Sequence, residues 1–403
     1  MVWDYCTRYM ATNTLLHCLL GCAIAVALAA ALGGLLRACG VRGAWIAAGV
    51  CVGALLGGDA LGRVQPAWHD QFFAGAMDAR RQAFVAEREI EIANLAALSS
   101  GALVDVDDLS KLESTLRAAQ ERVREATMKF NQPAVWITAM LAAFVMIGAS
   151  PLIERIVWWR HGGLAVGLLY MLVPASVIIA TLTLSDRPEP DAWWMYAIGI
   201  LCIGAASMQQ RDRWVASRML GDFASTLDAA RGAAGVIACV LALVAGLCAA
   251  EHDAAWLLPW GAMLAAWGLA TEPPRSLKRL VGPAVAGVVA IAITRIDLQV
   301  DWKSWIVLGI FVAAEDMRWL GAGTGLSLWT RIAWKPCLRA AMPLADASLA
   351  QAALGSVAYL SNLIPAWIAL AILISAAAVE LLEPLRRRTA LGLDQAIQQS
   401  SDV

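Results

Sequence analysis

Three ionisable residues lie close together inside a long apolar stretch, and they are the strongest candidates for chemistry in this sequence. A helix of the 25 residues from Trp305 to Trp329 would be about 36 Å long, enough to cross a bilayer with some tilt. Glu315, Asp316 and Arg318 fall near its middle, where charged groups are costly unless they face the protein interior and are paired. Glu315 and Arg318 are spaced so that they can meet on one helix face. The pattern is typical of an ion or proton site inside a helix bundle.

Two other interpretations of these three residues stay open. In one, they form a structural pair that neutralises itself and locks the helix in place. Alternatively, the true span is shorter, and Arg318 extends its guanidinium group to the cytoplasmic interface.

Other polar residues in apolar stretches are weaker candidates. Asp346, near the start of a later stretch, is either a further member of the ion site or a cap for that helix. Ser207, Gln209 and Gln210 are candidates for lining a cavity. Two arginines follow them directly, which favours an inner helix end instead.

The composition is that of a membrane protein. Of the 403 residues, 60% are hydrophobic and 16% are charged, against about 25% charged in ordinary soluble domains. This balance excludes a water-soluble globule, a disordered chain and a disulfide-stapled secreted domain. The formal net charge of −1 gives no reason to expect a nucleic-acid partner.

Cysteine and histidine spacing predicts neither a metal site nor a cofactor. The nine cysteines include no CxxC pair, and the four histidines are scattered. We therefore expect the cysteines in apolar runs to be small packing residues. No phosphate-binding loop, dinucleotide fingerprint or nucleophile elbow occurs, so we expect no enzyme.

Eleven apolar stretches are long enough to predict a polytopic, all-α membrane bundle. They cover 14–36, 44–62, 133–154, 162–184, 193–210, 230–250, 254–271, 279–295, 303–329, 341–360 and 364–383. Lysine and arginine are concentrated in alternate loops, which places the N-terminus outside and the C-terminus in the cytoplasm. The opposite loops are poor in base; Arg295, Asp297 and Asp301 are expected in one of them. We predict an integral protein of a bacterial inner membrane.

The polar segment 63–132 is expected to form an extracytoplasmic hairpin of two amphipathic helices. The first covers about 71–98; the second begins at a capping box made by Ser110 and Glu113 and runs to about Phe130. The hairpin either folds on itself or offers a surface for dimerisation. The predicted organisation is thus two spans (1–62), this hairpin, a main bundle (133–388) and a cytoplasmic tail (389–403).

Several stretches, in order, resemble the membrane domain of monovalent cation:proton antiporters of the sodium/proton exchanger type. The second span ends in GGDALGRVQP (57–66), and WMYAIGILCIGAASMQQRDRWVASRML follows from Trp194. AAEDMRWLGAGTG begins at Ala313, and the last two spans begin with AMPLADAS at Ala341. The resemblance implies secondary transport of a monovalent cation against protons, with Arg318 where the family has a buried base. The implied partners are the lipid bilayer, protons and the cation, with a homodimer through the hairpin as a further expectation.

The chain also departs from the antiporter pattern. The family places one or two carboxylates in the span after its broken helix, but here no acid lies between Asp228 and Glu251. The expected helix break lacks its proline and acid, and about two helices are missing before Arg318. Two functions therefore remain: a transporter whose ion site has moved to Glu315, Asp316 and Arg318, or a non-transporting membrane scaffold or sensor. An unrelated polytopic protein is a third possibility.

Overall fold

The computed structural model describes most of the chain as helices. The described residues are 2–73, 82, 85–86, 88–90, 92, 106–149, 162–184, 222–248, 254–269, 274–296, 309–310, 312–314, 317–341, 349–364 and 366–378. Within these ranges there is no strand, so the predicted all-α class is confirmed there.

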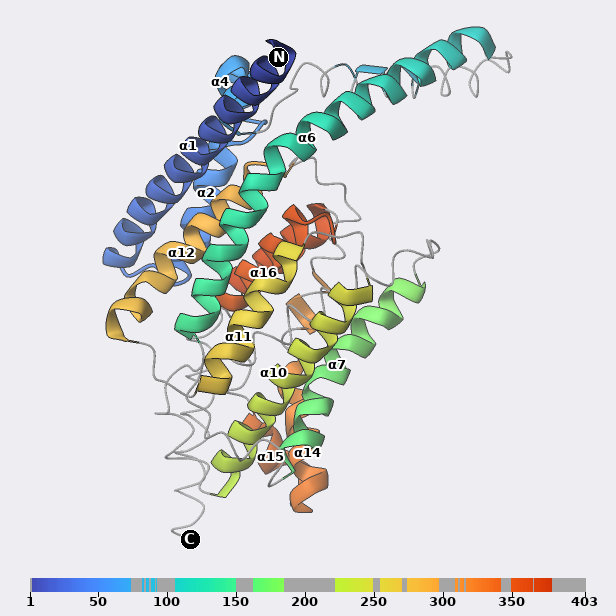
Figure 1. The fold of residues 1–403 in the computed structure, drawn as a ribbon. Helices are drawn as coiled ribbons and strands as arrows, with labels where there is room; N and C mark the ends of the chain where they lie inside the picture. The colour runs from blue at the N-terminus through green and yellow to red at the C-terminus, as the bar shows by residue number, and fades with distance from the viewer. Residues whose placement is uncertain are drawn as a thin grey trace.

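The helices form one bundle, shown in Figure 1. They are α1 (Val2–Ala38), α2 (Ala44–Leu56), α3 (Leu61–Val64), α4 (Pro66–Phe72), α6 (Val106–Ala149), α7 (Gly163–Leu184), α10 (Asp222–Cys248), α11 (Leu257–Leu269), α12 (Arg275–Ile293), α14 (Arg318–Thr330), α15 (Trp334–Ala341) and α16 (Leu349–Leu360). A short 3₁₀ turn, Ala254–Trp256, precedes α11, and residues 366–378 are also helical. Two groups stand out: α1, α2, α4 and α12 on one side, and α7, α10, α14 and α15 on the other, with α6, α11 and α16 between them.

Among the described residues, three segments are long and apolar enough to cross a membrane: Leu15–Ala38, Ala44–Val64 and Arg275–Ile293. Six shorter apolar helices accompany them: Gln132–Gly148, Gly163–Val173, Gly232–Ala242, Ala254–Ala265, Leu349–Leu360 and Ala366–Ala378. Each lies within or overlaps one of the predicted spans. The predicted span 193–210 lies outside the described residues, and the count of eleven stays a prediction.

The outer faces of these helices are apolar. Along α7, Leu164, Leu168 and Leu172 are exposed at intervals of one turn, whereas Val166 and Tyr170 are buried. Such stripes of large exposed apolar side chains suit a hydrocarbon solvent better than water. They agree with a membrane protein.

Glycines allow α2 and α12 to pack closely. A Cβ atom at Gly49 would come 2.7 Å from the Ala286 carbonyl oxygen, and one at Gly53 would come 2.8 Å from that of Ala290. Small residues four apart are the usual means by which membrane helices approach each other. The order of these contacts shows that α2 and α12 run in the same direction.

Other contacts fix the relative directions of α1 and α12. Cys18, near the middle of α1, meets Arg295 just after the end of α12, and Val26, further along α1, packs against Gly287 of α12. Near the N-terminal end of α12, Gly282 contacts Trp45 of α2, the helix that follows α1. Helices α1 and α12 are therefore antiparallel, as alternately directed spans require; which end faces the cytoplasm stays a prediction from the loop charges.

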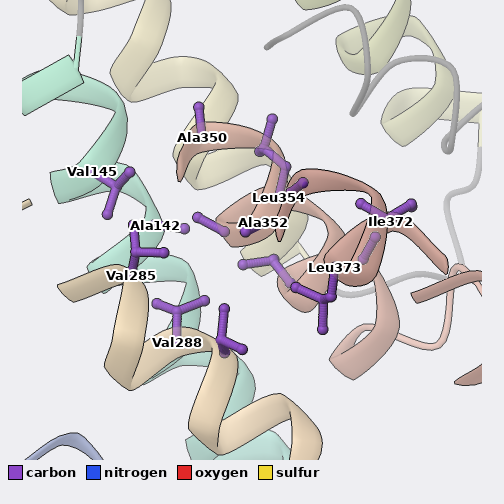
Figure 2. Close-up of a cluster of buried hydrophobic side chains, with 14 of the residues drawn as sticks. Ala142, Val145, Val285, Val288, Ala350, Ala352, Leu354, Ile372 and Leu373 are labelled. Carbon is purple, nitrogen blue, oxygen red and sulfur yellow. The ribbon is translucent and has the colours of Figure 1, made fainter. Parts of the chain in front are cut away.

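The central core joins α6, α12, α16 and the helix 366–378. Figure 2 shows side chains from these four segments interdigitating, and they are buried. The labelled ones are Ala142, Val145, Val285, Val288, Ala350, Ala352, Leu354, Ile372 and Leu373. Helix α16 (Leu349–Leu360) covers the second half of the predicted span 341–360, and residues 342–348 lie outside the described residues.

The structure corrects the predicted hairpin. Helix α6 runs without interruption from Val106 to Ala149, so the second hairpin helix and the third span are one helix of 44 residues. Ser110 lies inside the helix, so it is not the N-cap. In Figure 1 the N-terminal part of α6 projects away from the other labelled helices; residues 106–132 are called the α6 arm below. Much of the expected first helix, 71–98, lies outside the described residues.

Candidate functional site

Helix α14 begins inside the predicted span 303–329. Residues 312–314 are helical, Met317 lies in a turn with φ −74° and ψ −8°, and α14 starts at Arg318. The Met317 N–H donates to the Ala313 carbonyl at 2.9 Å, and its own carbonyl accepts from Leu320 N–H at 3.0 Å. Arg318 is thus the first residue of a helix whose start lies within the bundle.

Glycines on α14 and before α7 bring α14 against α7. A Cβ at Gly321 would collide with the Leu169 carbonyl, and one at Gly325 would come 2.9 Å from Val166 Cα. At the far end, Trp329 covers Gly162 so closely that no side chain fits there. Residues later in α14 contact residues earlier in α7, so the two helices are antiparallel.

This packing encloses Arg318. Its side chain is 0% exposed, and its Cζ atom lies 5.8 Å from the centroid of the Tyr170 ring, which is itself buried. A guanidinium over an aromatic face is attracted by the ring quadrupole, more strongly where water is excluded. The interpretation in which Arg318 extends into interfacial water disagrees with this burial.

The register of α14 gives the depth of Arg318. Trp329 is 54% exposed, as expected of an anchor at the membrane interface. Arg318 lies eleven residues earlier, which is about 16 Å along the helix, roughly half of a hydrocarbon core about 30 Å thick. A base at this depth is expensive, and the bundle must compensate for it.

The remaining predicted site residues lie outside the described residues. Among them are the two acids next to Arg318 and the acid that precedes α16. The full set is Glu315, Asp316, Asp346, Ser207, Gln209 and Gln210. Their distances from Arg318 therefore stay predictions.

Tyr170 is the neighbour that the sequence analysis missed. It is an aromatic hydroxyl in the middle of the apolar stretch 162–184, and that is the signal that could have drawn attention to it. Buried tyrosines usually place their hydroxyl group near a polar partner. The structure pairs its ring with Arg318.

Helix α10 contacts both α7 and α14, but with small apolar residues. Ala230, Ala233 and Ala234 are buried, and a Cβ at Gly167 of α7 would come 2.7 Å from the Ala230 carbonyl. This is the helix in which the antiporter pattern would place its carboxylates. Here it provides close packing instead.

A second buried base lies where the sequence analysis expects a loop. Arg295 follows α12 and is only 6% exposed. Its Nη1 donates to the Ile291 carbonyl at 3.1 Å, its Nη2 lies 3.9 Å from Cys18 Sγ, and Tyr359 donates its hydroxyl to the Arg295 carbonyl at 2.7 Å. Arg295 lies in the turn after α12, as the loop prediction has it, but it is buried because α1 and α16 enclose the end of α12. Asp297 and Asp301 lie outside the described residues.

Comparisons with protein-family models, with curated proteins and with solved structures find no match. The resemblance to cation:proton antiporters therefore rests on the motifs quoted above. The geometry around Arg318 rests on the structure alone.

Proposed function

We propose that this protein is a membrane transporter of the cation:proton antiporter type, with its ion site at Arg318. The observation that carries the proposal is a fully buried guanidinium at the start of α14. We propose that it lies near the middle of the membrane. Glu315 and Asp316, which precede it directly in the chain, are proposed as the acids of the site.

The charge balance of this group suits exchange. A buried arginine stays protonated, so it requires a carboxylate as a partner. Two carboxylates with one guanidinium leave one net negative charge, which either a proton or a monovalent cation neutralises. Burial and the neighbouring acid favour the proton, whereas the guanidinium favours the ionised form, so the two ligands compete.

The same proposal includes the wider architecture. We propose eleven spans in a bacterial inner membrane, with the N-terminus and the α6 arm outside and the C-terminus in the cytoplasm. The arm is proposed to contact a second copy of the chain. The support is the alternation of loop charges, together with the projection of α6 from the bundle.

A second function is favoured by a different observation. The small-residue packing of α10 against α7 replaces the carboxylates that the antiporter pattern needs. A protein that kept the bundle but lost exchange would act as a scaffold or sensor, with Arg318 as part of a structural ion pair.

Ion flux in proteoliposomes separates the two functions. Purified protein is reconstituted with an internal pH-sensitive dye, a pH gradient is imposed, and lithium, sodium, potassium or rubidium is added outside. Exchange predicts that at least one cation dissipates the gradient, and that Glu315→Gln and Arg318→Ala abolish this effect. Lys335→Gln, at an exposed position on α15, is the matched control and should retain the flux. A wild-type protein that moves none of these cations would favour the scaffold.

A further inference from the structure

Two buried thiols and a buried base meet at one end of the bundle, far along the chain from the proposed ion site. Cys18 and Cys22 are one turn apart on α1 and are 0% and 4% exposed. Residues four apart on a helix lie on the same face, and both of these side chains are buried. The side chains therefore face the same interior space.

Arg295 provides a positive charge beside these thiols. Its Nη2 lies 3.9 Å from Cys18 Sγ, and its Nη1 contacts two neutral oxygens, the Ile291 carbonyl at 3.1 Å and the Thr294 hydroxyl at 3.4 Å. The hydrogen bond from Tyr359 to the Arg295 carbonyl ties this position to α16. The base is thus held in place by two helices other than α1.

This set of groups selects a particular class of ligand. Thiolates bind soft metal ions, and a neighbouring base favours the thiolate over the thiol. Zinc requires about four protein ligands at a structural site, and no group of three or more metal-binding side chains occurs in the part of the chain that the structure describes. A soft ion that accepts two sulfur ligands fits where zinc does not.

We propose that Cys18 and Cys22 bind one Cu(I) ion, with Arg295 as the counter-charge. Binding breaks two S–H bonds and forms two sulfur–copper bonds, and both protons leave to solvent, so no electron is transferred. Two thiolates and one monovalent ion carry a charge of −1. The guanidinium beside Cys18 attracts this negative charge, which lowers the cost of burying the site.

The place of the site in the fold gives the ion a route. Cys18 follows Leu15, the first residue of the apolar segment of α1, by three residues, which is about 5 Å of helix. Arg295 lies just beyond the end of α12. In the predicted span 14–36, Cys18 lies about 6 Å of helix from the outer end, so we propose that the ion enters from that side.

Metal binding to cysteine variants tests the proposal. In a pair-only protein, the seven cysteines other than Cys18 and Cys22 are replaced by alanine; in a cysteine-free protein, all nine are. Cu(I) is titrated under reducing conditions against a coloured Cu(I) chelator. We expect one ion per chain in the pair-only protein and none in the cysteine-free protein. Equal binding by the two proteins would overturn the site.

Arg295 variants test the counter-charge. In the pair-only protein, Arg295→Gln should weaken Cu(I) binding about ten- to a hundredfold, the usual effect of losing a group next to metal ligands. Arg295→Lys should retain most of the affinity because it keeps the charge. Equal affinities for the three proteins would show that Arg295 takes no part.

A measurement on the wild-type chain guards against misfolded variants. Native mass spectrometry with Ag(I), a redox-inert soft ion, should find one tightly held ion in the wild type. The ion should be lost in Cys18→Ala/Cys22→Ala but kept in Cys239→Ala, which removes a buried cysteine elsewhere. An ion retained by the double variant would place it at other cysteines and contradict the proposal.

Discussion

The guanidinium of Arg318 lies over the ring of Tyr170, with Cζ 5.8 Å from the ring centroid. The two residues come from antiparallel helices, α14 and α7, that approach each other at glycines. A fully buried base is thus partly stabilised by an aromatic face rather than by water. The contact links the stability of the bundle to the proposed ion site.

Replacing the Tyr170 ring should destabilise the protein. Tyr170→Leu removes a desolvated cation–π contact worth about 2 kcal/mol, so the melting temperature in detergent should fall clearly. Tyr170→Phe keeps the ring and should cost only about 1 kcal/mol, the usual contribution of a hydroxyl hydrogen bond. Equal melting temperatures for the two variants would show that the ring face contributes nothing.

Arg318 should behave as one half of a buried ion pair. Arg318→Ala is expected to cost about 3–5 kcal/mol, because it leaves an acid buried without its base. Arg318→Met combined with Glu315→Leu should recover most of that loss, since replacing a whole buried pair by apolar residues is often neutral. Thermal melts of the single and double variants measure the rescue. No rescue would mean that Glu315 is not the partner.

The contact between α2 and α12 should not tolerate a methyl group. Gly53→Ala places a Cβ 2.8 Å from the Ala290 carbonyl, which backbone movement must relieve, so we expect a loss of about 1–3 kcal/mol. Gly34→Ala on α1 is the matched control, because nothing lies within 4 Å of its added Cβ. That variant should be neutral or stabilising by up to about 1 kcal/mol. Differential scanning fluorimetry compares the two, and similar effects would rule out the close approach.

The continuity of α6 can be measured directly. Spin labels at Ala118 and Met140, both exposed, are 22 residues apart and should lie about 33 Å apart along one straight helix. Pulsed electron resonance should find one narrow distance distribution near that value. A broad distribution at shorter distances would show that the helix is interrupted near residue 132, as the sequence analysis predicts. Labels at Met140 and Ile147 within the bundle serve as a control.

The sequence predicted the helical class and many helix positions well because the bilayer imposes their length. An apolar run such as 279–295 has few alternatives to a spanning helix, and α12 covers most of it. The burial of Arg318 follows from the same reasoning, since a base in such a run must face protein.

The contacts between distant residues were beyond that reasoning. Tyr170 meets Arg318 only because Gly321 and Gly325 let α14 approach α7, and single-sequence patterns do not encode such a pairing. Arg295 stands just after an apolar run and therefore resembles a loop residue. It is buried because Cys18 and Tyr359 approach it from other helices.

The continuity of α6 was missed for a local reason. Ser110 and Glu113 have the spacing of a helix start, and Pro133 is a typical sign of a helix end. One proline removes a single backbone hydrogen bond and can be accommodated in a long helix whose other residues favour helix. The local helix-start and helix-end patterns at Ser110 and Pro133 therefore do not interrupt α6, because the residues on both sides of them continue the helix.

Because α6 is one helix, it acts mechanically as a lever. The α6 arm, residues 106–132, is about 40 Å long, and residues 133–149 extend about 25 Å between α1, α11, α12 and α16. If the helix pivots where it enters the bundle, a 4 Å displacement of the arm tip moves its inner end by roughly 2.5 Å in the opposite direction. Movement of the arm by a bound partner would therefore shift Ala142 and Val145 in the core. No loop separates the arm from these two residues, so the movement is transmitted along a continuous helix.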